Sequence, residues 1–245
     1  MKIKQYKAFD YRVVVSAVMM TLVFPVGGAV SLTLGSAMRV SGELIAQTSQ
    51  QRKEEVIRLN EQGVQLFGQG KYSEALELFE KALVICKQID DKSGEGAYLN
   101  NIGLVYNNLG QYQKALDYYQ QSLVIRKQIG DKSGEGTTLN NIGVVYRSLG
   151  QYQKALDYYQ QALVISKHLG DKSGEGTTLN NIGAVYRSLG QYQKALDYYQ
   201  QALVISKHLG DKSGEGTTLN GIGRVYNSLG QYQKALDYFQ QSLVI

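Results

Sequence analysis

Four residue types are nearly absent from this 245-residue chain, which has one cysteine, one proline, two histidines and no tryptophan. A single cysteine excludes an intrachain disulfide, and so few histidines and cysteines leave no ligand set for a His/Cys zinc site. The only proline is Pro25, and the glycines, 27 in all, follow it. A long proline-free stretch punctuated by glycine is typical of helices joined by tight turns, and it argues against a β-sandwich or barrel.

The excess positive charge is concentrated at one end of the chain. The net charge is +5, of which residues 1–46 contribute +3 and the remaining 199 residues only +2. The basic isoelectric point therefore reflects the N-terminal segment more than the body of the protein. A body with almost balanced charge does not indicate nucleic-acid binding, and we expect no nucleic-acid partner.

The N-terminal segment has the pattern of a targeting sequence. Residues 1–12 are net positive, and residues 13–37 contain no charged side chain. This pattern resembles a secretory signal peptide, and the interruption at Pro25 favours a signal peptide that ends there. The uncharged stretch is also long enough to span a bilayer. Two interpretations stay open for residues 1–46: a signal peptide of an exported (periplasmic or extracellular) protein, or a membrane anchor formed by residues 13–37, each with a short linker. We expect membrane contact only through this segment.

The remainder of the chain is one unit repeated every 40 residues. Residues 151–190 and 191–230 differ at only three of 40 positions. A fixed period near 40 predicts stacked supersecondary units that bury their apolar faces against one another. We place the array at residues 52–245, with repeats near 56–95, 96–135, 136–175, 176–215 and 216–245, the last of them shortened. The glycines and alanines that mark the period are Gly63, Gly103, Gly143, Gly183 and Gly223, and Ala75, Ala115, Ala155, Ala195 and Ala235.

Each repeat has the pattern of two helices. Leu139, Ile142 and Tyr146 recur at helical spacing along one face. Gly150 ends this first helix and Gly170 ends the second, because glycine adopts positive φ without a Cβ penalty. The period therefore predicts a hairpin of two helices, each of roughly 15–18 residues. We expect Tyr146, Tyr152 and Tyr159 to supply large apolar surface around the crossing of the two helices, with Tyr146 in the core.

These residues resemble the tetratricopeptide repeat (TPR). The 40-residue length resembles the variety found in kinesin light chains and Pins-type polarity adaptors, and similar arrays occur in cyanobacterial multi-repeat proteins. Leu139 stands where the family usually has tryptophan, and the usual proline near the end of the repeat is absent. The resemblance implies an all-α fold, a right-handed α-solenoid of five helix hairpins, and a protein-binding scaffold rather than an enzyme. The residues that carry the resemblance in one repeat are Leu139, Ile142, Gly143, Tyr146, Ala155, Tyr159 and Ala162.

Several features imitate chemical sites but recur as scaffold. The segment Asp-Lys-Ser-Gly-Glu-Gly lacks the P-loop pattern and returns in every linker, which indicates helix capping, with Asp171 as one such cap. An EF-hand match fails because its last ligand position holds Ile142. His168 is predicted to be exposed, and Cys86 aligns with Arg126, Ser166 and Ser206 at what we interpret as a solvent-facing position. We therefore expect no catalytic residue, no metal and no cofactor.

The resemblance implies that ligands lie on the inner surface formed by the first helix of each repeat. No residue predicted there is acidic, and asparagine amides can bond both the N–H and the C=O of an extended peptide. Arginines add sites for carboxylates, so we expect an extended, acidic peptide or protein partner. Alternatively, these side chains are solvated or bond the neighbouring repeat. The predicted contact residues are Asn100, Asn107, Asn140, Arg147, Asn180, Arg187, Asn220 and Arg224.

A second interpretation concerns the end of the chain. The sequence stops at Ile245, inside the second helix of the last repeat, without a polar capping helix. The chain could be the sensor portion of a larger protein whose effector domain, for example a CHAT protease-like domain, is absent. We expect either a continuation of the array or coverage of the last repeat by another subunit, including self-association.

Overall fold

The computed structural model describes the backbone of residues 34–245 and the side chains from Thr48 onward. The signal peptide or anchor expected over residues 13–37 thus lies outside the residues with described side chains. No helix within residues 34–245 is long and apolar enough to cross a membrane. The repeat body, Gln47–Ile245, forms a unit separate from residues 1–46.

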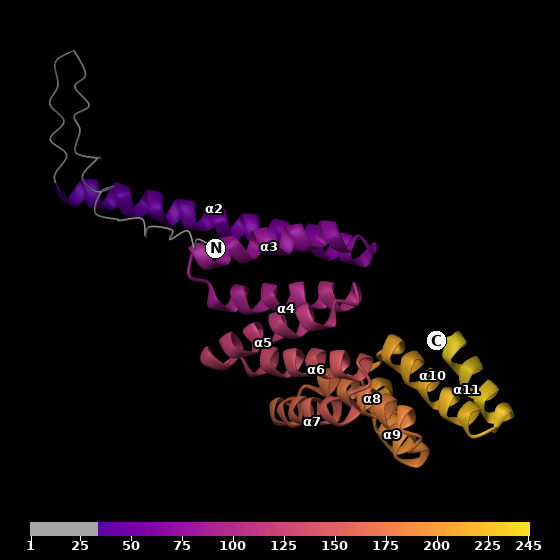
Figure 1. Ribbon diagram of the computed structural model, residues 1–245. Coiled ribbons are helices and arrows are strands. Elements are labelled where there is room, and N and C mark those ends of the chain that lie inside the picture. Colours follow the sequence, from indigo (N-terminus) through magenta and orange to yellow (C-terminus); the bar gives the residue numbers. More distant parts are fainter. Residues whose placement is uncertain (1–33) are drawn as a thin grey trace, which may run out of the picture. The chain divides into compact units, whose positions relative to one another are not determined.

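The described residues form ten helices arranged as successive hairpins, with no strand among them (Figure 1). This confirms the all-helical hairpin fold predicted from the 40-residue period, while the right-handed superhelical sense stays a prediction. The helices are α2 (Leu34–Gly68), α3 (Tyr72–Gln88), α4 (Lys92–Asn108), α5 (Tyr112–Gln128), α6 (Lys132–Ser148), α7 (Tyr152–Leu169), α8 (Lys172–Ser188), α9 (Tyr192–Leu209), α10 (Lys212–Ser228) and α11 (Tyr232–Val244).

The two helices of each hairpin cross where a glycine meets an aromatic ring. In the third hairpin, a Cβ added to Gly143 would come within 2.6 Å of the Tyr159 ring. Tyr159 is fully buried, whereas Tyr146 is only half-buried and stacks on Tyr158 with ring centroids 5.3 Å apart. The crossing was predicted correctly, and of the tyrosines expected around it Tyr159 is the central one, whereas Tyr146 lies nearer the rim than predicted. The other crossings pair Gly63 with Phe79, Gly103 with Tyr119, Gly183 with Tyr199 and Gly223 with Phe239.

The linkers between hairpins combine a helix cap with a buried carboxylate. Asp171 Oδ1 accepts a hydrogen bond of 2.9 Å from the backbone N–H of Gly174, which confirms the predicted cap of α8. Glu175 is buried, and its carboxylate pairs with Lys172 at 2.8 Å and with Lys167 at 4.0 Å. Since charge buried in this way needs a partner, the recurring acidic and basic residues of the linker are structural. The same cap recurs at Asp91, Asp131 and Asp211.

Candidate functional site

The first helices of the repeats form one continuous surface. Helices α4, α6, α8 and α10 contact one another in succession, in addition to the contacts that each makes with its neighbours in the chain. The second helices α5, α7 and α9 make no comparable contacts among themselves within the described repeats. The first helices therefore lie on the inner side of the stack, where the predicted contact residues are found.

Asparagines link successive first helices by hydrogen bonds. Asn141 donates from Nδ2 to Asn100 Oδ1 at 3.1 Å, and Asn181 makes the same bond to Asn140 Oδ1 one repeat later. Asn100 also accepts from Thr138 Oγ1 at 3.3 Å and is only 7% exposed. The amide of Asn100 is thus engaged within the protein, as the alternative interpretation of the asparagines allowed.

Gly221 interrupts this ladder. It occupies the position held by Asn141 and Asn181 in the two preceding repeats. Without an amide there, Asn180 Oδ1 is buried and has no hydrogen-bond partner. The Nε atom of Arg187 is also buried and unpartnered. A buried polar group without a partner is costly, so these two side chains mark the junction of α8 and α10 as a place where a ligand could supply hydrogen bonds.

The predicted arginines lie along the same inner surface but differ in their engagement. Arg147 is half-buried and donates from Nη1 to Asn181 Oδ1 at 3.4 Å. Arg224 is exposed and donates from Nε to Asn220 Oδ1 at 3.0 Å. Asn107, which aligns with Arg147, has a buried Oδ1 without a partner. The structure therefore brings all eight predicted residues onto the first helices, and their contact with a ligand stays a prediction.

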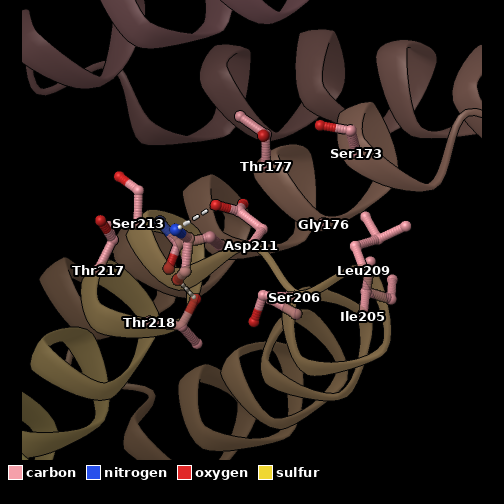
Figure 2. Close-up of a pocket in the computed structure, with 13 residues that line it drawn as sticks. Ser173, Gly176, Thr177, Ile205, Ser206, Leu209, Asp211, Ser213, Thr217 and Thr218 are labelled. Atoms are coloured by element: carbon pink, nitrogen blue, oxygen red, sulfur yellow. Dashed lines mark hydrogen bonds between the residues drawn. The ribbon is translucent and has the colours of Figure 1, made fainter. Parts of the chain in front are cut away.

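Two cavities that the sequence did not reveal open between successive repeats. One lies among α8, α9 and α10 with a volume of about 260 Å³, and its equivalent among α6, α7 and α8 has about 290 Å³. Figure 2 shows the first cavity, with Ile205 and Leu209 on one side, Ser213 and Thr217 on the other, and Asp211 between them. The asparagines Asn180 and Asn140 line the first and the second cavity, respectively.

The residue that determines these cavities was interpreted wrongly from the sequence. Cys86, Arg126, Ser166 and Ser206 share one position in the repeat, and we expected it to face solvent. In the structure Cys86 is fully buried, both serines are 6% exposed, and burial raises the pKa of the Cys86 thiol to about 11. The error came from the chemical variety at this position. The side chain at this position differs between repeats, and it determines whether the space at each junction is filled or left as a cavity.

Comparison with known proteins identifies the fold family. The tetratricopeptide repeat family matches residues 55–128, 95–168 and 174–245, and no curated protein matches the sequence. Among solved structures, BtubC (BKLC) from P. vanneervenii has a TM-score of 0.64 at 21% identity, covering 80% of this chain and 87% of that one. The nearly identical TPR-like repeats assigned to a kinesin light chain of Podosopora anserina have a TM-score of 0.60 at 20% identity, covering 77% and 93%.

A third similar structure is a complex. A Rap protein complexed with Competence and Sporulation Factor has a TM-score of 0.71 at 19% identity, covering 77% of this chain and 53% of that one. The present chain thus spans about half the length of the Rap protein. At these identities the structures establish a shared fold, and the family match extends over most of the repeat body. The chain belongs to the tetratricopeptide repeat family.

Proposed function

We propose that the repeat body is a non-enzymatic scaffold that binds an extended peptide segment of a partner protein along the inner surface of α4, α6, α8 and α10. The observation that carries this proposal is the row of asparagines and arginines on these helices. This row includes Asn180 Oδ1 and Arg187 Nε, two buried atoms without a hydrogen-bond partner at the junction of α8 and α10. An extended peptide offers both C=O acceptors and N–H donors, so it can satisfy these two groups together. The similar Rap structure contains Competence and Sporulation Factor, which supports binding of a peptide-like partner by this fold.

The arginines give the proposed groove a charge preference. None of the eight groove residues is acidic, whereas Arg147, Arg187 and Arg224 place three guanidinium groups along it. A guanidinium matches the two oxygens of a carboxylate. We infer that acidic side chains of the bound segment face this row of arginines.

Charge reversal tests this function directly. An array of random acidic, basic and neutral 12-residue peptides is probed with the full chain and with the triple variant Arg147→Glu, Arg187→Glu and Arg224→Glu. We expect acidic peptides to bind the parent chain and to lose at least tenfold in affinity in the variant, with the parent's affinity falling as salt is added. Lys81→Glu, on the exposed face of α3, is the control for charge reversal outside the groove. Unchanged acidic-peptide binding in the triple variant would refute the groove.

A second proposal concerns the place where this scaffold acts. We propose that the protein is exported by a signal peptide, with anchoring by residues 13–37 as the second candidate, because a basic segment precedes an uncharged one. Fractionation of cells that produce the chain with a C-terminal tag separates these cases. A shortened soluble form indicates export with cleavage, a full-length form in the membrane fraction indicates an anchor, and a full-length soluble form contradicts both.

A further inference from the structure

At one junction between repeats, the space equivalent to these cavities is filled by a side chain of the protein itself. At the junction of α4, α5 and α6, the side chain of Arg126 lies in the space that is hollow at the next two junctions. Its Nε donates to Ser122 Oγ at 3.2 Å, and its Nη1 donates to Asp131 Oδ2 at 2.6 Å. A Cβ added to Gly134 would overlap the Arg126 guanidinium. The site formed by the end of α5 and the start of α6 is therefore shaped for a guanidinium group.

The next two junctions keep this site but lack the guanidinium. Ser166 and Ser206 replace Arg126 at intervals of 40 residues, and both serines line the cavities together with Asp171 and Asp211. Each serine donates to a backbone carbonyl of its own helix at 3.1 Å, so its oxygen keeps lone pairs for a donor. The missing arginine thus accounts for the cavities at the α7–α8 and α9–α10 junctions.

The carboxylates of the empty sites lack the ion pair seen at the filled one. Asp131 pairs with Arg126, with 29% of its side chain exposed. Asp171 and Asp211 each accept the capping hydrogen bond through Oδ1 alone, and they have no cationic partner among the described residues. The lysines nearby pair instead with Glu175 and Glu215. Oδ2 of each aspartate is therefore available to a cation that enters the cavity.

The cavity at the α9–α10 junction has one further acceptor without a donor. Asn180 lines it, and Asn180 Oδ1 is buried without a hydrogen-bond partner because Gly221 replaces the asparagine that would have donated to it. The buried acceptor calls for an N–H donor, and the carboxylate of Asp211, which is exposed to solvent, adds a negative charge at the same cavity. The aspartate would repel a negatively charged ligand. A guanidinium, in contrast, supplies five N–H donors and a positive charge.

We propose that these two cavities bind the guanidinium groups of arginine side chains from the partner, each in the place that Arg126 fills within the array. This inference rests on the proposed function, in that the arginines belong to the bound peptide segment. The repeat body would then bind side chains of both charges. Acidic side chains of the segment face Arg147, Arg187 and Arg224. Its arginine side chains enter the cavities beside Asp171 and Asp211. Two cavities in consecutive repeats favour a segment that carries two arginines, because the second binds intramolecularly once the first is in place.

The repeats themselves supply the variants that test this proposal. The replacements Ala162→Ser with Ser166→Arg, and Ala202→Ser with Ser206→Arg, copy the residues of the filled junction into the two empty ones. The reverse replacement, Ser122→Ala with Arg126→Ser, opens a third site. Asp171→Asn and Asp211→Asn remove the charge but keep the helix cap, since asparagine caps helices about as well as aspartate.

The full chain is titrated with Nα-acetyl-arginine amide, and with Nα-acetyl-citrulline amide as the uncharged equivalent of the same shape. Amide NMR signals of Gly174 and Gly214, at the two caps, report on occupancy. We expect both signals to shift with the arginine probe and at least fivefold less with the citrulline probe. The filled variants and the asparagine variants should lose the response, and the opened variant should gain one at Gly134.

Three results would overturn the proposal: no shift with the arginine probe, equal shifts with citrulline, or persistence of the response in the filled variants. An equal response to Nα-acetyl-lysine amide would show that the cavities bind any cation and are not selective for a guanidinium. If the filled variants fail to fold, the asparagine variants still decide. Loss of acidic-peptide binding on reversal of the three groove arginines is measured separately, so the cavity proposal and the proposed function can fail independently.

Discussion

At the residue scale, the helix crossing depends on the fit between Gly143 and Tyr159. The ring of Tyr159 lies directly over the glycine, and the side chain is fully buried. Burial raises the pKa of Tyr159 to about 12, so the phenol stays protonated at neutral pH. Its hydroxyl is buried without a hydrogen-bond partner. The ring therefore contributes packing to stability, whereas the hydroxyl contributes little or even reduces it.

This division predicts opposite outcomes for two substitutions. Tyr159→Ala should lower the free energy of unfolding of the central repeats by about 3–5 kcal/mol, as expected for removal of a buried aromatic side chain. Tyr159→Phe should leave that free energy within about 1 kcal/mol of the parent value or raise it, because it removes an unsatisfied buried hydroxyl. Urea unfolding followed by circular dichroism measures both. A loss of several kcal/mol in the phenylalanine variant would reveal a hydrogen bond to the hydroxyl.

Helical periodicity identified the inward face of a helix but not the depth of each side chain. It placed Tyr146 in the core, yet Tyr146 is half-buried and stacks on Tyr158 at the rim, while Tyr159 takes the centre. The same limit explains the misassigned position of Cys86. Residues at the end of a second helix meet the following repeat, and this contact between repeats is not encoded in the period of either helix.

At the scale of one element, each first helix ends in a short hydrogen-bonded turn that needs glycine. Gly150 has φ of 70°, its N–H donates to Arg147 O at 3.0 Å, and the N–H of Gln151 donates to Tyr146 O at 2.9 Å. These two bonds are those of a Schellman motif. The glycine that follows the first helix, Gly150 in the third hairpin, was sufficient to predict this helix end from the sequence.

A left-handed conformation predicts a penalty for any side chain at this position. Gly150→Ala should destabilise the hairpin of α6 and α7 by about 1–2 kcal/mol, although nothing lies within 4 Å of the added methyl group. The cost comes from the backbone alone, so it should appear as a lower urea midpoint with an unchanged slope. Gly68→Ala is the matched control, since Gly68 has equally open surroundings without a positive φ. A neutral Gly150→Ala would show that this turn can rearrange.

At the scale of the whole repeat body, the sequence period was enough to predict the stacked hairpins, because each repeat carries the same small residues at its crossing and the same glycine at its turns. It was not enough for the polar inner surface. The asparagine ladder depends on side chains from two successive repeats, and it breaks where Gly221 replaces one asparagine. The proposed groove and cavities therefore arise from the differences between repeats, whereas the fold arises from what they share.

The last hairpin differs from the others in the apolar surface that it exposes. Tyr232 is 70% exposed in α11, and Leu243 and Val244 are 85% and 89% exposed. In α7 and α9 the equivalents of Leu243, Leu163 and Leu203, are only 4% and 5% exposed, whereas the equivalents of Val244, Val164 and Val204, are 58% and 59% exposed. An apolar helix face without a covering element is expected either to open locally or to associate with a second surface.

Hydrogen exchange distinguishes these behaviours in the full chain. In dilute solution, where sedimentation shows a monomer, we expect amides of residues 232–245 to exchange at least tenfold faster than those of residues 152–165, because local opening of α11 exposes little that was buried. At high concentration, self-association through Tyr232 and Leu243 should slow that exchange and leave residues 152–165 unchanged. Leu243→Lys should abolish the concentration dependence without altering the dilute rates elsewhere. Equal protection of the two segments in the monomer would show that α11 is held as firmly as α7 and needs no covering surface.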